Sequence, residues 1–161
     1  MATKVGSLIA AIGTKMVSTF TGFSVVYGLP DSSGSYGLTG AVVFVHYREE
    51  KGEFTGSQLG GSMLVQPVIS VTAARPFTGT STALASEQSR IELGADLRAA
   101  IGALVMDHVM GTTPIADFPG QALFVTEYAS TPSCIDLGTG QSMEAVTVDF
   151  TFKFSSTYGS R

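Results

Sequence analysis

Residues 144–154 show the best alternation of apolar and polar side chains in the chain. A β-strand points successive side chains to opposite faces, so this segment has one apolar and one polar face. The apolar face comprises Val146, Val148, Phe150, Phe152 and Phe154, and the polar face comprises Thr147, Asp149, Thr151 and Lys153. Burial of each Phe contributes about 2 to 3 kcal/mol before entropy is counted. Such alternation is typical of an antiparallel sheet that buries one face and exposes the other.

Four further segments have the composition and length of strands. They are residues 23–27, 42–47, 63–73 and 122–128. Segment 42–47 is almost continuously apolar, which predicts a central strand. Pro67 lacks the N–H that a sheet ladder needs, so we expect its strand at a sheet edge or with a bulge at that point. In the last segment, the alternation predicts Phe124 and Tyr128 on one face and Glu127 on the other.

The first of two predicted amphipathic helices extends from about Lys4 to Ser18. Its apolar residues follow the spacing of one helix face: Val5, Leu8, Ile9, Ile12 and Met16. Gly6 and Gly13 weaken this helix by about 1 kcal/mol each relative to Ala. Its stability must therefore come from packing against the rest of the protein.

The second predicted helix begins near Ser86 or Ser89 and ends near His108. Ser89 and Glu92 have the spacing of a capping box, in which two side chains satisfy free backbone N–H groups at the helix start. One stripe of this helix is apolar: Leu93, Leu97, Ile101, Leu104 and Val105. Gly111 is placed for a left-handed C-cap. We expect Gly94 and Gly102 to let the helix lie close to a sheet.

Together these segments predict an α+β fold within a single domain, residues 1–161. Its two layers are an antiparallel sheet of about four to five strands and two helices packed on one face of that sheet.

The chain is poor in charge, since 14% of its residues are charged and 44% are apolar. A soluble domain typically has about 25% charged residues. A small domain with so few charges and so regular a pattern is expected to cover part of its surface with other protein, as a subunit of an assembly. The alternative is a monomer whose surface consists of Ser, Thr and Gly.

The net charge is −4 and the basic residues are scattered. This excludes the basic stripe that direct nucleic-acid binding requires. It is compatible with a channel that DNA passes without binding, because like charges repel the phosphate backbone. No segment approaches the ~20 apolar residues that span a bilayer, and the N-terminal apolar run lacks a signal-peptide cleavage site. We therefore expect a soluble, unexported protein with no membrane partner.

Candidate catalytic and metal-binding residues are few. His46 and His108 are far apart, and neither has a Cys, Asp or Glu at a recognised ligand spacing. The lone Cys134 has no Lys, Arg or His beside it in the sequence to lower its pKa. The Gly-rich strings lack the Lys-Ser/Thr ending of a phosphate-binding loop. We expect no enzyme activity, no cofactor and no metal.

Residues 48–62 are predicted to form a long, polar and Gly-rich hairpin loop. This loop contains the densest group of charges in the chain, a run that either is simply solvated or contacts a partner. The candidate partner-binding residues are Glu49, Glu50, Lys51, Glu53, Phe54 and Leu59. We expect the loop to be mobile in the free subunit and to become ordered when a partner covers Phe54 and Leu59.

The order of these elements resembles that of the tail terminator (tail completion) proteins of long-tailed bacteriophages. The matching segments are the opening helix with Leu8, Ile9 and Ile12, the strand pair at 42–47 and 63–73, the helix from Leu93 to Val105 and the final strand ending at Phe154. The resemblance covers nearly the whole chain, includes no catalytic motif and carries over no individual functional residue.

The resemblance implies a ring, a hexamer in this family, that caps the finished tail tube, ends its polymerisation and joins the tail to the head or neck. Its partners would be other copies of the chain, the tail tube protein and a head or neck connector protein. The location would be the virion, after assembly in the host cytoplasm. Three other functions stay open: a different head-to-tail connector or neck subunit, a small-molecule binding module with a pocket between helix and sheet, and an enzyme of an unrecognised kind. The scarcity of His, Cys and paired carboxylates disfavours the enzyme most.

Overall fold

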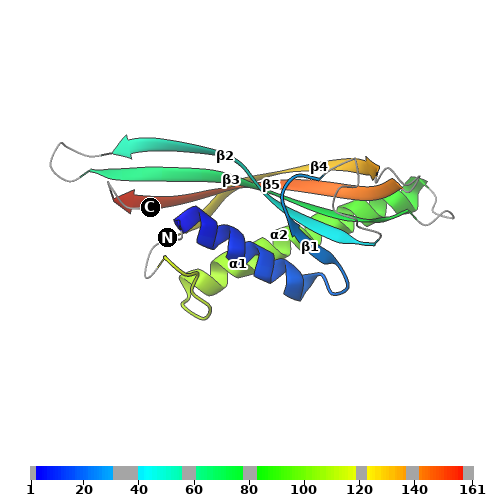
Figure 1. Cartoon of the computed structure of the whole chain (residues 1–161), viewed down its shortest axis with the longest axis horizontal. Coiled ribbons are helices and arrows are strands. Elements are labelled where there is room, and N and C mark those ends of the chain that lie inside the picture. Colours follow the sequence, from blue (N-terminus) through cyan, green and yellow to red (C-terminus); the bar gives the residue numbers. More distant parts are fainter. Residues whose placement is uncertain are drawn as a thin grey trace.

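The computed structural model describes residues 3–30, 40–55, 61–77, 83–118, 123–136 and 142–157. Five strands form one open sheet in the order β1-β2-β3-β5-β4, and two helices cover one of its faces (Figure 1). The elements are α1 (Lys4–Thr19), β1 (Ser24–Tyr27), β2 (Val42–Thr55), β3 (Ser62–Pro76), α2 (Ala83–Val109), β4 (Phe124–Asp136) and β5 (Ser142–Thr157). The predicted α+β class and the two-layer arrangement are confirmed.

The sheet is antiparallel except at one edge. Strand β1 pairs parallel to β2, with Ser24 opposite Val42 and Tyr27 opposite Val45. The remaining neighbours, β2–β3, β3–β5 and β5–β4, are all antiparallel. The sheet is therefore mixed. The sequence of β1 could not predict its parallel pairing, because the side-chain pattern of a four-residue strand is the same for parallel and antiparallel neighbours.

Strand β3 lies at the centre of the sheet, so of the two alternatives expected at Pro67, an edge strand or a bulge, the edge strand is wrong. The missing N–H is accommodated in two ways. The ladder between β3 and β5 is interrupted between Val65 and Val68, so Gln66 and Pro67 have no paired residue in β5. On the other side, the register of β2 shifts between Tyr47 and Glu49, so the bulge lies on the partner strand, close to Pro67.

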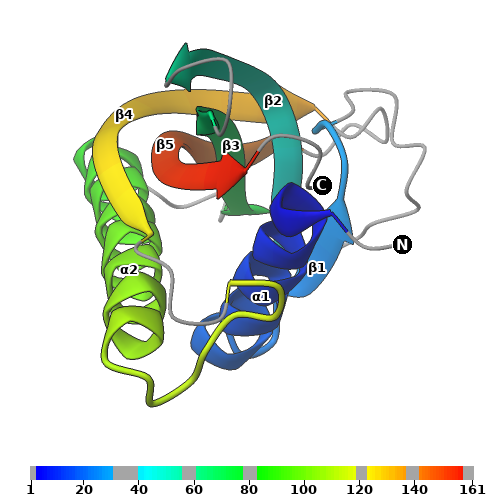
Figure 2. The same ribbon diagram turned by 90° about the vertical axis from the view of Figure 1, so that its left-hand side faces the viewer.

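The apolar face of β5 is buried as predicted, with Phe150 2% and Phe152 0% exposed. It forms the main core with the inward stripes of both helices. Figure 2 shows α1 and α2 side by side under the curved sheet. A second, smaller core lies on the opposite face of the sheet: Val42, Phe44, Ala74, Ile135, Met143 and Ala145.

The two helix starts differ from each other in how they are stabilised. The side chain of Thr3 caps α1 by accepting a hydrogen bond from the backbone N–H of Gly6 at 3.0 Å. The predicted capping box of α2 is wrong, because α2 already begins at Ala83 and Ser89 lies inside it. The Ser89 hydroxyl instead bonds the side chains of Arg75 and Glu144.

Three glycines show where backbone freedom or close approach is needed. Gly111 ends α2 in the left-handed region, with φ of 74°, as predicted. A Cβ on Gly94 would lie 3.5 Å from Val146, so this glycine does bring α2 close to the sheet, whereas Gly102 has nothing within 4 Å. A Cβ on Gly13 would lie 2.0 Å from the Tyr27 hydroxyl, so Gly13 lets that ring pack onto α1.

Candidate interaction surfaces

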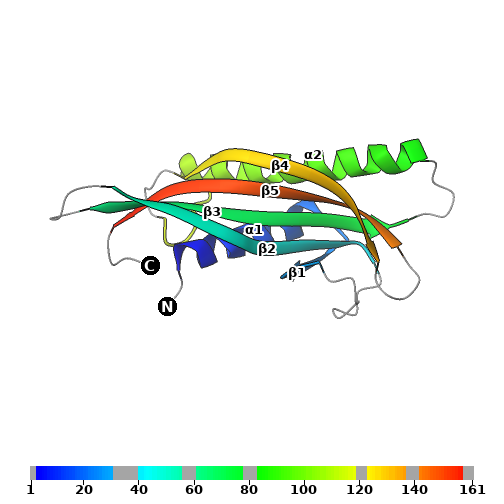
Figure 3. The same cartoon turned by 90° about the horizontal axis from the view of Figure 1, so that it is seen from above.

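The β2–β3 hairpin extends into an arm, comprising residues 48–55 of β2 and 62–66 of β3, that projects beyond the helices (Figures 1 and 3). Paired residues continue along it, from Glu50 opposite Pro67 to Thr55 opposite Ser62. The predicted long loop is therefore wrong for residues 48–55, which are strand. Pairing with β3 gives these residues regular structure, and their mobility in the free subunit stays a prediction.

The candidate partner-binding residues lie on two different faces of the arm. The period of two places Glu50 and Phe54 on the helix side, and Glu49, Lys51 and Glu53 on the opposite side. Phe54 is 77% exposed. Leu59 lies outside the described residues. The sequence predicts all six residues in one loop, whereas strand β2 separates the five described ones into two sets.

Strand β2 has an open edge along the arm. Its pairing with β1 ends at Val45, and from His46 onward the described residues place no strand on that side. Charged side chains on an edge strand disfavour pairing with another strand. The charge run from Arg48 to Glu53 has this effect here, which gives it a structural role beside any partner binding.

Arg48, at the bulge, ties the arm to the rest of the sheet. Its guanidinium forms a salt bridge across β3 with Asp149 of β5. The same carboxylate accepts a hydrogen bond from Ser70. These contacts fix the base of the arm on the face away from the helices.

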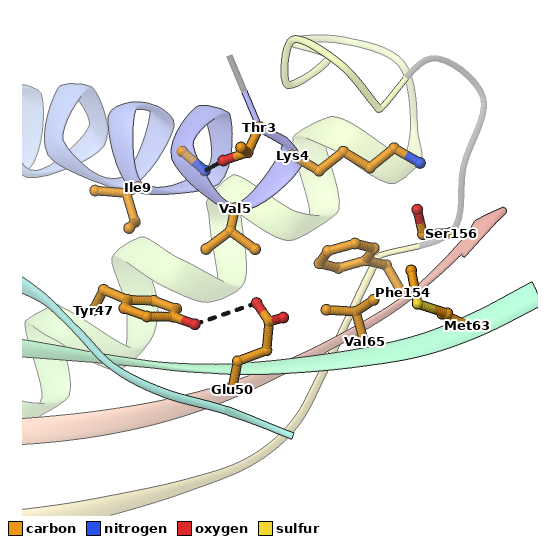
Figure 4. A pocket seen from close by; sticks show the side chains of 11 residues that line it. Thr3, Lys4, Val5, Ile9, Tyr47, Glu50, Met63, Val65, Phe154 and Ser156 are labelled. Atoms are coloured by element: carbon orange, nitrogen blue, oxygen red, sulfur yellow. Dashed lines mark hydrogen bonds between the residues drawn. The ribbon is translucent and has the colours of Figure 1, made fainter. Parts of the chain in front are cut away.

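An open pocket of about 680 Å³ lies at the base of the arm on the helix side (Figure 4). Most of its wall is apolar, and it is lined by the start of α1 and by β2, β3 and β5: Thr3, Lys4, Val5, Gly6, Ile9, Tyr47, Glu50, Met63, Val65, Phe154 and Ser156. We call it the arm pocket. Sequence analysis missed it because its walls come from both ends of the chain, and no local pattern brings α1 to β5.

Tyr47 and Glu50 are the polar pair in this pocket. The Tyr47 hydroxyl donates a hydrogen bond to Glu50 Oε2 at 3.4 Å (Figure 4). Partial burial raises the pKa of Tyr47, and the charge and hydrogen bond of Glu50 raise it further. Tyr47 is therefore a neutral donor at physiological pH.

A buried ionic cluster joins β3, α2 and β5 at the other end of the sheet. Glu144, with 8% of its side chain exposed, accepts hydrogen bonds from Arg75 Nε at 3.0 Å, from Ser86 at 3.0 Å and from Ser89. Burial alone would raise the pKa of Glu144, but these hydrogen bonds and the charge of Arg75 outweigh it and lower the pKa. The cluster is a structural tie between helix and sheet.

Two further residues that could be catalytic, His108 and Cys134, make hydrogen bonds within the fold. His108 is buried, and its Nδ1 accepts a hydrogen bond from the backbone N–H of Ile115 at 3.0 Å. Cys134 is exposed, and Arg90, remote in sequence, donates to its sulfur at 3.2 Å. Within the described part of the chain, no group of three or more His, Cys, Asp or Glu could hold a metal ion. Neither described helix is long and apolar enough to cross a membrane.

No protein-family model and no curated protein matches this chain. Two solved structures are similar to this chain, one from a virion and one from a contractile injection system. One is the virion of a native gene transfer agent particle, with a TM-score of 0.49, 16% identity and coverage of 95% of this chain and 96% of that chain. The other is the sheath/tube terminator of an extracellular contractile injection system, PVC, in its extended state. Its TM-score is 0.46 at 11% identity, and the match covers 99% of this chain and 60% of that chain.

Both TM-scores are below 0.5 and both identities are below 25%, so the similarity alone assigns no activity to this chain.

Proposed function

We propose that this chain is a tail-associated structural protein of a virion that forms a closed ring on the end of a tail tube. As in the family that the sequence resembles, the ring is a hexamer, ends tube polymerisation and joins the tail to a head or neck protein. DNA passes through its channel without specific binding. The subunits assemble in the host cytoplasm.

One observation carries this proposal: the fold leaves large apolar side chains exposed on three separate parts of its surface. They are Phe54 on the arm, Leu84 and Ile91 on α2, and Tyr27 and Leu29 at β1, each between 56% and 77% exposed. Scattered apolar residues are normal on a monomer, but here they coincide with a low content of charge. A subunit that has contacts on several sides in an assembly accounts for both features.

The arm is proposed to be the part that contacts the tube. It projects from the body, and its helix-side face combines exposed Phe54 with the mostly apolar arm pocket. An aromatic anchor beside an apolar pocket is typical of the centre of a protein interface. Glu49, Lys51 and Glu53, on the other face, have a net negative charge that suits a basic partner surface or a DNA channel.

The ring is tested by the native mass of the purified protein and by electron microscopy of the protein mixed with tail tubes. A Phe54→Glu variant should keep the native mass, because Phe54 is 77% exposed and belongs to neither core. It should lose attachment to tubes, because it places a charge on the proposed contact. Phe77→Glu is the matched control, since Phe77 is also exposed but follows the other end of β3.

Attachment should be normal in the Phe77 variant. Wild-type protein that stays monomeric with and without tubes would contradict the ring, and normal attachment of the Phe54 variant would contradict the role of the arm.

A different head-to-tail connector subunit is the nearest alternative, and binding to the neck protein without binding to tubes would favour it. The arm pocket also keeps a small-molecule binding module open, because its volume lies within the range of ligand sites. A ligand of constant mass retained in native mass spectrometry would support that function.

A further inference from the structure

Irregularities in three neighbouring strand pairs lie at one level across the sheet. Between β2 and β3 the register shifts at Arg48. Between β3 and β5 the ladder lacks pairs at Gln66 and Pro67 and then resumes in the same register. Between β4 and β5 the register shifts at Thr126. We call this transverse line, comprising Arg48, Gln66, Pro67 and Thr126, the seam.

The irregularities of the seam are aligned, because each lies within two residues of the pair Val68–Thr151. A bulge bends its strand and locally disrupts the ladder, and a proline has no N–H to give to one. A single bulge is held in place by regular ladders on either side of it, whereas here the next ladder is irregular at the same level. The seam is therefore the line along which this sheet resists bending least.

Beyond the seam, the arm is only weakly anchored in the protein interior. Of its described residues, only Val65 packs against the main core, and none belongs to the second core. Residues 47–54 of β2 are all exposed. The β3 half of the arm pairs with residues 154–157 of β5, of which Phe154 is in the main core but lies beside the seam, where a pivot displaces it least. Few buried apolar contacts and an exposed ladder are typical of the less stable parts of a fold.

The arm pocket lies on the helix side of the seam, and its walls come from both sides of that line (Figure 4). The start of α1 and Tyr47 belong to the body of the protein. Glu50, Met63 and Val65 belong to the arm. Because the pocket is open and measures about 680 Å³, it leaves room for the arm to move toward α1.

We propose that the arm, together with the paired end of β5, pivots about the seam and thereby narrows and widens the arm pocket. The Tyr47–Glu50 hydrogen bond at 3.4 Å limits this motion on the helix side. On the other face, the Arg48–Asp149 salt bridge holds the seam to the body.

The size of the motion follows from the length of the arm. At about 3.3 Å per residue, Glu53 lies about 16 Å from Arg48, so a pivot of about 20° moves Glu53 by about 6 Å. Collective hinge motions of this kind take microseconds to milliseconds. The pivot belongs to the free subunit, so it goes beyond the proposed function and does not depend on it.

The test measures distances between pairs of spin labels in the free protein by pulsed electron paramagnetic resonance, in a Cys134→Ser background. One pair, Glu53→Cys with Val17→Cys, joins the arm to α1. The control pair, Thr131→Cys with Val17→Cys, joins two parts of the body. All three labelled positions are exposed, so the fold should be retained. The distance distribution of the arm pair should be broader than that of the control pair by about 6 Å, and equal widths would overturn the proposal.

Two variants test whether the seam is the pivot. Pro67→Val supplies the N–H that the seam lacks and should narrow the distribution of the arm pair. Pro76→Val is the matched control, a proline of β3 outside the seam, and should leave the width unchanged. Tyr47→Phe removes the hydrogen bond to Glu50 and should broaden the distribution. A width that neither Pro67→Val nor Tyr47→Phe alters would overturn the proposal, and because no tubes are present, none of these outcomes bears on the proposed ring.

Discussion

Glu144 is a buried carboxylate whose ionisation links the fold to pH. Its partners, Arg75, Ser86 and Ser89, come from β3 and α2, and Glu144 itself belongs to β5. The lowered pKa means that the folded state favours the charged form more than the unfolded chain does. The resulting stability is fully present above the ordinary pKa of 4.5 and is lost as the pH falls through the lowered value.

Glu144→Gln should therefore lower the free energy of unfolding by about 2 kcal/mol at pH 7, the range for hydrogen bonds to charged groups. Acidification from about pH 5 to about pH 3 should destabilise the wild type more steeply than the variant, because the variant has no carboxylate at this position to protonate. Urea unfolding at several pH values measures both effects. Parallel pH profiles for the two proteins would show that Glu144 does not contribute in this way.

At the scale of elements, β5 organises both cores. It is paired on both sides, by β3 and by β4, and contributes five buried residues to the main core: Val146, Val148, Phe150, Phe152 and Phe154. Thr151, between two of these phenylalanines, points to the other face and donates a hydrogen bond to Glu127 at 3.3 Å. Neighbouring residues of one strand thus have very different environments.

Phe152→Ala should lower the free energy of unfolding by about 3 to 5 kcal/mol, because it leaves a cavity where the side chain is 0% exposed. Thr151→Ala should change it by less than about 0.5 kcal/mol, since its hydrogen bond is exposed. Denaturant unfolding of both variants gives the comparison. Similar losses would mean that the strand is in another register or is buried on both faces at this point.

For the whole molecule, the balance of apolar and charged surface predicts how the proposed ring responds to salt. Raising the salt from about 0.1 M to about 1 M shortens the Debye length from about 10 Å to about 3 Å and weakens the attraction between charged side chains of neighbouring subunits. Apolar contact is not weakened by this screening. The ring mass should persist at about 1 M salt, while assembly from diluted subunits should become several-fold slower.

Sedimentation at both salt concentrations and light scattering after dilution test this expectation. Dissociation at high salt would mean that charge pairs, and not apolar contacts, hold the subunits together.

Local periodicity in the sequence by itself determined which face of each regular element is buried. The alternation in β5 and the helical spacing in α1 and α2 all predicted core faces that the structure contains. A period of two or of 3.6 depends only on backbone geometry, so it can be read without knowing the neighbouring element. The positive φ at Gly111 followed equally from local chemistry.

Contacts between segments far apart in the sequence decided the length of β2, the place of Pro67 in the sheet and the register of β4. Strand β2 continues past Tyr47 through charged residues and Gly52 because β3 offers it hydrogen bonds, which outweigh low strand propensity. Pro67 is tolerated in a central strand because the ladder to β5 is interrupted there. The register shift in β4 puts Phe124 opposite Lys153 and Tyr128 opposite Phe150, so the predicted shared face of Phe124 and Tyr128 is wrong. The arm pocket arises only when both ends of the chain meet, because its walls come from α1 and β5 as well as from the arm.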